Sequence, residues 1–544
     1  MYKSKIMKSN LLKYILGLGM ILSSFNCSKD SLNINQNPNG AAESNMTAAV
    51  ILPQAMLIAA NRVSTGYGYL GHWLGYWCPG ANYSPNTEEQ SYNISTNFAA
   101  GTFSGIMDNA YDFQFAESLA KASKQNFYIG ITKVMNAFNF TTLVDVYNNI
   151  PYTQALQGLA YVRPQYDDGK LVYEKSLQQI DSAITFFKAA KASGEINDDV
   201  KSRDIIFKGN PDKWIRFGNT LKLRLLIHQS AKADRAAYIT TEISKIVAEG
   251  SGFLKSGEDA AASPGFTSDL GKSNPFYSTF GFTSTGTPAT DFWRANRFAM
   301  EELKISADPR LGAFYKKVVN AFPAGGKEPF VQSAPLDYRG NEYGRPIDNN
   351  SFPNQIANFV SQIGGVSSAG PVSAGAIGLI KGYDQPSWIL TSVESFFLQA
   401  EAIERGWLAG SKEDAYKNAI KESFRWLNID GSSSAADASF TKWYATQDEN
   451  NNKKVSYAKA DDKLKIVLYQ KYMALNGSNH LESWTDYRRN GAYPVLPLSV
   501  NPGRTSSTLP VRILYPQREY DLNTASVQAQ GSISQFTSKI WWMN

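Results

Sequence analysis

Cysteine and histidine are scarce in this chain of 544 residues, which holds two cysteines and three histidines. That scarcity excludes a disulfide-stabilised scaffold and a cysteine-rich zinc module. The sequence also lacks the H-E-x-x-H, G-x-S-x-G and P-loop motifs. Its adjacent acidic pairs stand at expected turns or helix starts, where they do not face each other across a cleft. We therefore predict no catalytic residue, no cofactor, no metal site and no enzymatic activity.

Positive charge is not concentrated in the body of the chain. The formal net charge is +6, yet the acid-free leader of residues 1–26 holds four lysines, and removing these four charges leaves +2. Surfaces that bind nucleic acid need a clear excess of basic groups. So small a charge predicts no nucleic-acid partner.

Long hydrophobic runs are missing as well. The apolar stretch Tyr14–Leu22 is too short to cross a bilayer, and with its basic start it predicts a secretory signal peptide over residues 1–26. Cys27 resembles the lipid-accepting cysteine of bacterial lipoproteins, although Asn26 stands where that motif usually has a small residue. Residues 27–45 are polar and turn-rich, which predicts a flexible lipidated tether. An ordinary cleaved signal with an incidental cysteine is the alternative.

Amphipathic helices are predicted in the first half of the chain. Residues 170–190 place apolar side chains at alternating steps of four and three. Asn210 followed by Pro211 is a typical start for a helix that would run to about residue 233. These patterns predict a helical repeat part over residues 46–250.

A second helical part is predicted over residues 389–544. Residues 389–408 and 411–427 form a helix pair separated by Gly410, with a length typical of a tetratricopeptide hairpin. Residues 124–190 are long enough for a similar pair. We therefore predict a mainly α fold that is built from tetratricopeptide-like helical hairpins.

The chain changes character between residues 251 and 388. Glycine, serine, proline and aromatic residues dominate there, and helical spacing is scarce apart from a predicted helix at 291–305. A structureless loop of this length is uncommon in a compact fold. We therefore predict an irregular, loop-rich subdomain that faces the ligand, because loops on a rigid frame commonly carry binding sites.

Aromatic residues make up 13% of the chain, and many of them stand among turn residues instead of in apolar runs. One concentration is an aromatic loop over residues 66–92. Its Gly66–Gly71 match to G-x-G-x-x-G lacks the preceding strand of a dinucleotide site. Flat side chains can stack on the apolar faces of sugar rings, and the alternative is that these rings pack in the core. The predicted ligand-binding residues are Trp73, Tyr76, Trp77, Tyr83 and Trp293.

Six segments together resemble the SusD/RagB-like nutrient-binding outer-membrane lipoproteins of Bacteroidetes-type bacteria. In chain order they are LVDVYNNIPYTQALQG (143–158), YDDGKLVYEKSLQQIDSAI (166–184), DKWIRFGNTLKLRLLIHQS (212–230), SWILTSVESFFLQAEAIERGW (387–407), YQKYMALNGSNHLESWTDYRRNGAYPVL (469–496) and RILYPQREYDLN (512–523). With the lipoprotein-like leader, the resemblance covers essentially the whole chain.

The resemblance implies a helical SusD-like fold of four tetratricopeptide-like hairpins with an irregular ligand-facing part. It implies a lipoprotein anchored in the outer membrane and facing the cell exterior, which captures oligosaccharides or peptides for a SusC-like TonB-dependent transporter. Binding positions vary within the family, so the resemblance assigns no ligand residue. Two alternatives stay open, a secreted glycan-degrading enzyme and a helical-repeat scaffold without a small ligand. Two carboxylates that face each other across a cleft would favour the enzyme.

Overall fold

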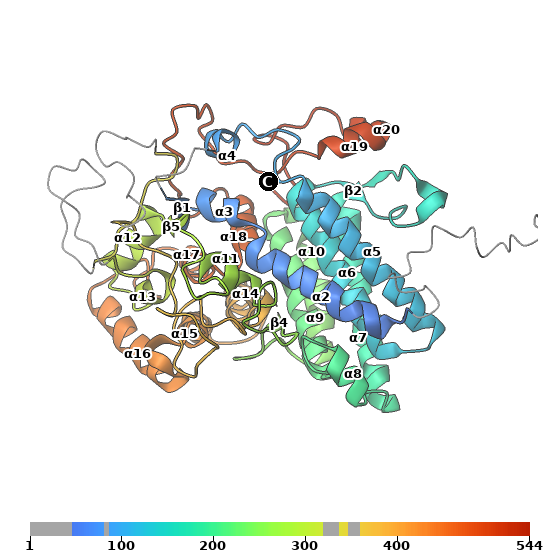
Figure 1. The fold of residues 1–544 in the computed structure, drawn as a ribbon, viewed down its shortest axis with the longest axis horizontal. Coiled ribbons are helices and arrows are strands. Elements are labelled where there is room, and N and C mark those ends of the chain that lie inside the picture. The colour runs from blue at the N-terminus through green and yellow to red at the C-terminus, as the bar shows by residue number, and fades with distance from the viewer. Residues whose placement is uncertain (1–45, 81–85, 319–336, 346–358) are drawn as a thin grey trace, which may run out of the picture. The chain divides into compact units, whose positions relative to one another are not determined.

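Helices make up most of the structure, as Figure 1 shows, and the predicted mainly α fold is confirmed. The structure is a computed structural model that describes residues 46–80, 86–318, 337–345 and 359–544. The predicted signal peptide, the tether with Cys27, and Tyr83 lie outside the described residues. Residues 48–544 belong to one compact unit. None of the described helices is both long and apolar enough to cross a membrane.

The first half of the chain is a layer of helices packed in sequence order, with a small two-stranded pairing of β2 and β3. Helix α6 lies at its centre, since α2, α5, α7 and α9 all contact it, and nearly all of its side chains are buried. The elements of this half are α2 (Ala48–Thr65), α3 (Gly68–Trp73), α4 (Thr87–Ser91), α5 (Gly101–Ala122), α6 (Asn126–Tyr147), β2 (Ile150–Pro151), β3 (Tyr166–Asp167), α7 (Gly169–Ser193), α8 (Asp198–Arg203), α9 (Pro211–His228) and α10 (Ala236–Glu249).

Capping residues explain where these helices begin and end. The Asp168 side chain accepts a hydrogen bond from the Lys170 amide (2.8 Å) at the start of α7, and Gly194 ends this helix with a φ of 69°. The predicted start at Asn210 is confirmed, because its side chain accepts from the amide of Lys213 (3.1 Å). The predicted apolar face of α7 is buried, and it consists of Tyr173, Leu177, Ile180, Ile184 and Phe187.

Two predicted helix ends were too late in the sequence. Helix α9 ends at His228 and not near residue 233, because short 3-10 turns follow it at Gln229–Ala231 and Ala233–Arg235. The helix predicted at 389–408 begins later and ends earlier, because Leu390 belongs to a strand and α14 runs only from Ser392 to Glu404.

The C-terminal helices form the second layer. Helices α14 and α15 pack as the predicted pair, and the Ser411 hydroxyl accepts from the amide of Asp414 (3.3 Å) to begin α15. The elements are α14 (Ser392–Glu404), α15 (Lys412–Trp426), α16 (Ser433–Glu449), α17 (Lys463–Ala474), α18 (His480–Arg489), α19 (Gln517–Leu522) and α20 (Thr524–Gln528).

Residues 251–388 hold only short elements where the structure describes them. Strand β5 pairs antiparallel with β1, and β6 pairs antiparallel with β4. The helix predicted at 291–305 was too long at its start. The observed helix begins only at Arg297, because the residues just before it form strand β5. The partner strand from the first half of the chain is β1 (Trp77–Pro79), and the elements of the segment are β4 (Ala260–Ala262), α11 (Pro275–Phe280), β5 (Trp293–Ala295), α12 (Arg297–Ile305), α13 (Leu311–Phe314) and β6 (Ser387–Leu390).

Candidate functional site

The aromatic loop is held by two short elements that pack inward. After a turn at Gly66, the chain forms α3, which contacts α18, and then β1, which pairs with β5. The predicted residues Trp73, Tyr76 and Trp77 have exposed fractions of 0, 0 and 1%. The expectation that turn residues leave these rings at the surface is therefore corrected, because the turn is short and leads at once into packed structure.

Protein rings cover the faces of these three side chains. The contacts, given as distances between ring centroids, are Trp73 to Phe98 (5.8 Å), Tyr76 to Tyr472 (4.5 Å) and Trp77 to His480 (4.5 Å). This is the core packing that the sequence left open as the alternative. A direct role of the three rings in ligand binding stays a prediction, and the fourth residue of the loop, Tyr83, lies outside the described residues.

Trp293 differs from the other predicted residues because it is only half-buried. Strand β5 places it opposite Pro79 of β1. Its ring packs edge-on against the half-buried Phe292 (5.0 Å) and against Trp77 (5.8 Å). Trp293 is thus the one predicted residue, among the described ones, that joins the buried cluster to solvent.

Behind Trp293 stands a polar group that sequence reasoning missed. The His72 ring stacks between Trp293 (4.8 Å) and Tyr343 (5.4 Å), and its Nδ1 lies 2.6 Å from the Glu89 carboxylate. The Tyr343 hydroxyl donates to the same carboxylate (2.8 Å). Burial opposes ionisation of Glu89, but His72 and Tyr343 together lower its pKa. No local motif connects these residues, since Tyr343 is remote in sequence.

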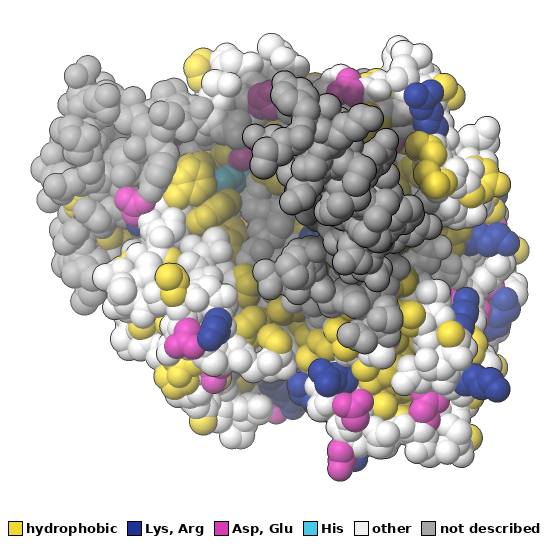
Figure 2. Space-filling view, turned by 45° about the vertical axis from the view of Figure 1, so that its right-hand side comes forward, with side chains coloured by type: hydrophobic (Ala, Val, Ile, Leu, Met, Phe, Trp, Pro, Cys, Tyr) yellow, Lys and Arg dark blue, Asp and Glu magenta, His cyan; other side chains and the backbone are white. Residues whose placement is uncertain are grey.

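This aromatic site, defined by His72, Phe292, Trp293 and Tyr343, combines two buried rings, His72 and Tyr343, with two half-buried side chains, Phe292 and Trp293. Hydrogen bonds and stacking hold its rings in place, so a ligand that binds to the accessible part costs the protein little side-chain freedom. Figure 2 shows one face of the molecule, on which hydrophobic side chains reach the surface in groups while charged side chains are scattered.

Two pockets open in the part of the chain that includes this site. One, of about 300 Å³, is lined by Tyr343 together with residues of α12 and with Pro497 and Leu498. The other, of about 510 Å³, is lined by residues of segments 281–288, 312–318 and 360–367 and by Tyr338. The loop-rich subdomain therefore contributes to two concave surfaces, and its role in facing the ligand stays a prediction.

Metal and thiol chemistry find little support in the described residues. No group of three or more His, Cys, Asp or Glu side chains among them could hold a metal ion. Cys78 is buried and unpaired, and burial raises its pKa to about 12. Cys78 therefore packs as a small hydrophobic side chain.

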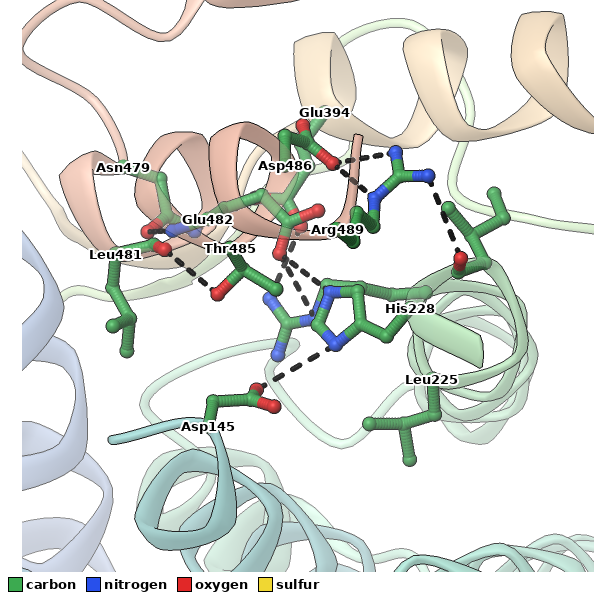
Figure 3. A network of polar contacts seen from close by, with 12 residues as sticks. Asp145, Leu225, His228, Glu394, Asn479, Leu481, Glu482, Thr485, Asp486 and Arg489 are labelled. Carbon is green, nitrogen blue, oxygen red and sulfur yellow. Dashed lines mark hydrogen bonds and ion pairs between the residues drawn. The ribbon is translucent and has the colours of Figure 1, made fainter. Parts of the chain in front are cut away.

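A buried charge network joins helices from both halves of the chain (Figure 3). The His228 ring of α9 lies between Asp145 of α6 and Glu482 of α18, at 3.6 and 3.0 Å from the nearer carboxylate oxygens. Glu482 also accepts from the Lys471 ammonium of α17 (2.6 Å). Further buried pairs are Arg224 with Glu394 (3.0 Å) and Arg489 with Glu401 (2.6 Å).

The arrangement around His228 resembles an acid–base site, yet its surroundings point to a structural role. His228 and Glu482 are 1 and 3% exposed, and the adjacent space of about 20 Å³ is far smaller than a sugar ring. The hydroxyl group closest to this histidine belongs to Tyr173, which is held by Asp145. His228 therefore has a structural role in the interior.

The network predicts a specific pH dependence of stability. Burial alone would lower the pKa of His228, but Glu482 and Asp145 raise it to about 9. A histidine whose pKa is higher in the folded than in the unfolded protein stabilises the folded state. This contribution is complete at pH values below the unfolded pKa of about 6.5, and it is lost as the pH rises through the folded pKa of about 9. We expect the free energy of unfolding to fall by about 3 kcal/mol between these pH values. Denaturant titrations at pH 6, 7.5 and 9 measure it.

Two variants isolate the contribution of His228. In His228→Gln the decrease between pH 6.5 and 9 should disappear. His480→Gln is the matched control, because burial lowers the pKa of His480 to about 3 and this ring is neutral throughout that range. An unchanged slope in His228→Gln would contradict the prediction.

Comparisons with known proteins agree with the fold and with the earlier resemblance. A family model described as starch-binding and associating with the outer membrane matches residues 38–516. A SusD homologue from Bacteroides fragilis is 19% identical, with a TM-score of 0.69, and the alignment covers 92% of this chain and 100% of that chain. A search among curated proteins gave no match.

Further solved structures share the architecture. A SusD-like protein from Bacteroides thetaiotaomicron is 22% identical, with a TM-score of 0.68 and coverage of 91% of this chain and 98% of that chain. A chitin-binding SusD homologue from Flavobacterium johnsoniae is 21% identical, with a TM-score of 0.69 and coverage of 90 and 98%. At this identity the likenesses establish the fold alone.

Proposed function

This chain belongs to the SusD-like family, whose model is described as starch-binding and associating with the outer membrane, and on that premise we propose that it binds an oligosaccharide nutrient. We further propose that it delivers this ligand to a SusC-like TonB-dependent transporter. The observation that carries the proposal is the family match over residues 38–516. The chitin-binding title of one structural relative supports a glycan as the ligand, and a peptide is the second candidate.

Trp293 is the residue through which we propose the ligand binds first. Its side chain is held by His72 and Trp77 and is only half-buried, so part of it is accessible to solvent. Trp77 packs against this ring from the interior. Trp73 and Tyr76, whose rings are buried, and Tyr83 remain proposed contacts. Rigid aromatic side chains that keep one face available are typical anchors of binding surfaces.

A binding panel tests the proposal. The protein without its leader is titrated calorimetrically with malto-oligosaccharides, chito-oligosaccharides, other neutral and acidic glycans, and short peptides. We expect one glycan class to bind, and Trp293→Ala to weaken that binding about tenfold or more. Trp407→Ala is the matched control, since this tryptophan is also half-buried but packs on Arg405, remote from the site.

Several outcomes of the panel would contradict the proposal. Binding of peptides alone would change the ligand class. Binding of nothing would favour a helical scaffold. Hydrolysis of a bound glycan would favour the secreted glycan-degrading enzyme.

The anchor proposal concerns Cys27, which lies outside the described residues. A lipid chain contributes about 0.8 kcal/mol for each buried CH₂ group, so acyl chains such as palmitate on this cysteine would hold the protein at the outer membrane. We expect the parent protein in the membrane fraction, co-purifying with a transporter after gentle detergent extraction. Cys27→Ala should appear in soluble fractions or fail to mature. An unchanged membrane fraction for this variant would refute the anchor.

A further inference from the structure

The larger of the two pockets in the loop-rich subdomain, of about 510 Å³, contains the feature that leads beyond a general glycan site. We name it the lysine pocket. Its residues that matter here are Phe282, Tyr315, Lys316, Lys317, Tyr338 and Gln362.

Main-chain pairing builds one wall of the lysine pocket. Tyr315 pairs antiparallel with Ile363, so the lysine that follows is fixed in an extended segment. The close approach needs glycine at position 364, because a β-carbon there would lie 2.2 Å from the carbonyl oxygen of Ala313. The wall is therefore defined by backbone geometry and not by a flexible loop.

Two cations and two aromatic rings line this pocket. The Lys316 ammonium lies 5.2 Å from the centroid of the Phe282 ring, and the Lys317 ammonium lies 5.8 Å from that of Tyr338. Lys316 and Tyr338 are half-buried, whereas Lys317 is exposed. The contacts with the rings help to position both ammonium groups at the pocket.

No acidic side chain is found among the described residues that line the lysine pocket. Asp337, the neighbour of Tyr338, is 3.4 Å from the ammonium of Lys304, a residue outside the pocket lining. Burial lowers the pKa of Lys316 without an opposing contribution from a described acid. An anion in the pocket would therefore gain two cations that it need not share with a lining carboxylate.

We propose that the lysine pocket binds the anionic group of an acidic oligosaccharide, a uronic-acid carboxylate or a sulfate ester. The inference rests on the proposed glycan-binding function and narrows its ligand class. Charge-assisted hydrogen bonds from Lys316 and Lys317 hold the anionic group. The half-buried Tyr338 ring offers a face to the sugar, and the Gln362 side chain can bond a hydroxyl group.

A matched set of four probes tests this inference on the protein without its leader. The probes are an oligogalacturonate, a sulfated galacto-oligosaccharide, a neutral galacto-oligosaccharide of the same length, and a glutamate pentapeptide. Calorimetry at low salt should give tighter binding for one acidic glycan than for the neutral one. Binding of that glycan should weaken as the ionic strength rises, because salt screens the two ammonium groups.

Substitutions then locate the binding. Lys316→Gln and Lys317→Gln should each weaken binding of the acidic glycan about tenfold or more, the loss expected for one charge-assisted hydrogen bond. Lys272→Gln is the control, because this lysine is also in the loop-rich part but is exposed and pairs with Asp269 (3.3 Å). Thermal melting of each variant verifies that it is folded.

The outcomes separate this inference from the proposed function. Neutral glycans that bind as tightly as acidic ones, or acidic binding that does not depend on the two lysines, would overturn the inference alone. Binding of the pentapeptide with the same lysine dependence would assign the pocket to acidic peptides and overturn the proposal that its ligand is an acidic oligosaccharide. Failure of every glycan, in this set and in the wider panel, would overturn both proposals.

Discussion

Replacing Arg489 with methionine lowers the free energy of unfolding by about 3–5 kcal/mol, the usual cost of breaking a buried ion pair by removing one partner. Arg489 and Glu401 are both fully buried, and two hydrogen bonds of 2.7 and 2.6 Å join them. Burial opposes ionisation of Glu401, but Arg489 and Arg405 lower its pKa to about 2. Without Arg489, the carboxylate is left in the interior with one partner at its edge. Chemical denaturation near pH 7 measures the loss.

Arg405→Met is the control for this prediction, because Arg405 pairs with the same carboxylate at 2.9 Å but is 18% exposed. Water screens this second pair, so its removal should cost about 1 kcal/mol or less. Because both variants replace arginine with methionine, the difference between their losses in free energy of unfolding measures the effect of burial. Equal losses for both arginines would contradict the importance that the structure gives to the buried pair.

Replacing Trp73 with alanine is expected to cost about 3–5 kcal/mol, as for other tryptophans removed from a core. Its ring is completely buried and contacts Phe98 and, edge-on, Trp484 of α18. The indole N–H also donates to the backbone carbonyl of Glu89 (3.1 Å). Denaturant midpoints measured together with ligand binding distinguish packing from direct contact.

Trp407→Ala gives the reference value for a half-buried tryptophan, for which we expect about 1–2 kcal/mol. A Trp73→Ala variant that keeps its stability but no longer binds the ligand would show that Trp73 contacts the ligand directly. A variant that loses stability and still binds when folded would place the residue in the core.

Periodicity and caps predicted the helical frame well because both are local. The buried face of α7, the caps at Asn210 and Ser411, and the α14–α15 pair all follow from residues within a few positions of one another. The SusD-like resemblance extended this to the whole fold.

Neither the aromatic site nor the packing of the aromatic loop could be predicted in the same way, because the packing partners are remote in sequence. Tyr76 stacks on Tyr472, and Trp77 packs on His480, so composition around residues 66–92 could not decide between surface and core. Arg512 shows the same limit. Glu519 is close to it in sequence, yet the guanidinium donates to the carbonyl of Tyr147, and Glu519 accepts from Tyr166 (2.7 Å).

The buried charge network also constrains the order in which the chain can acquire structure. Asp145 and His228 belong to helices that are synthesised early, whereas Glu482, the partner of His228, is synthesised much later. Trp542, which donates a hydrogen bond to Asp145 (3.0 Å), is also synthesised late. Until α18 forms, His228 and Asp145 have only each other and Tyr173 as partners, and the side of His228 that later meets Glu482 stays hydrated, because incompletely paired charges do not enter a dry interior. A truncated chain that ends before α14 should therefore fail to form a native N-terminal layer, and closure of the interior is a late, long-range event in folding.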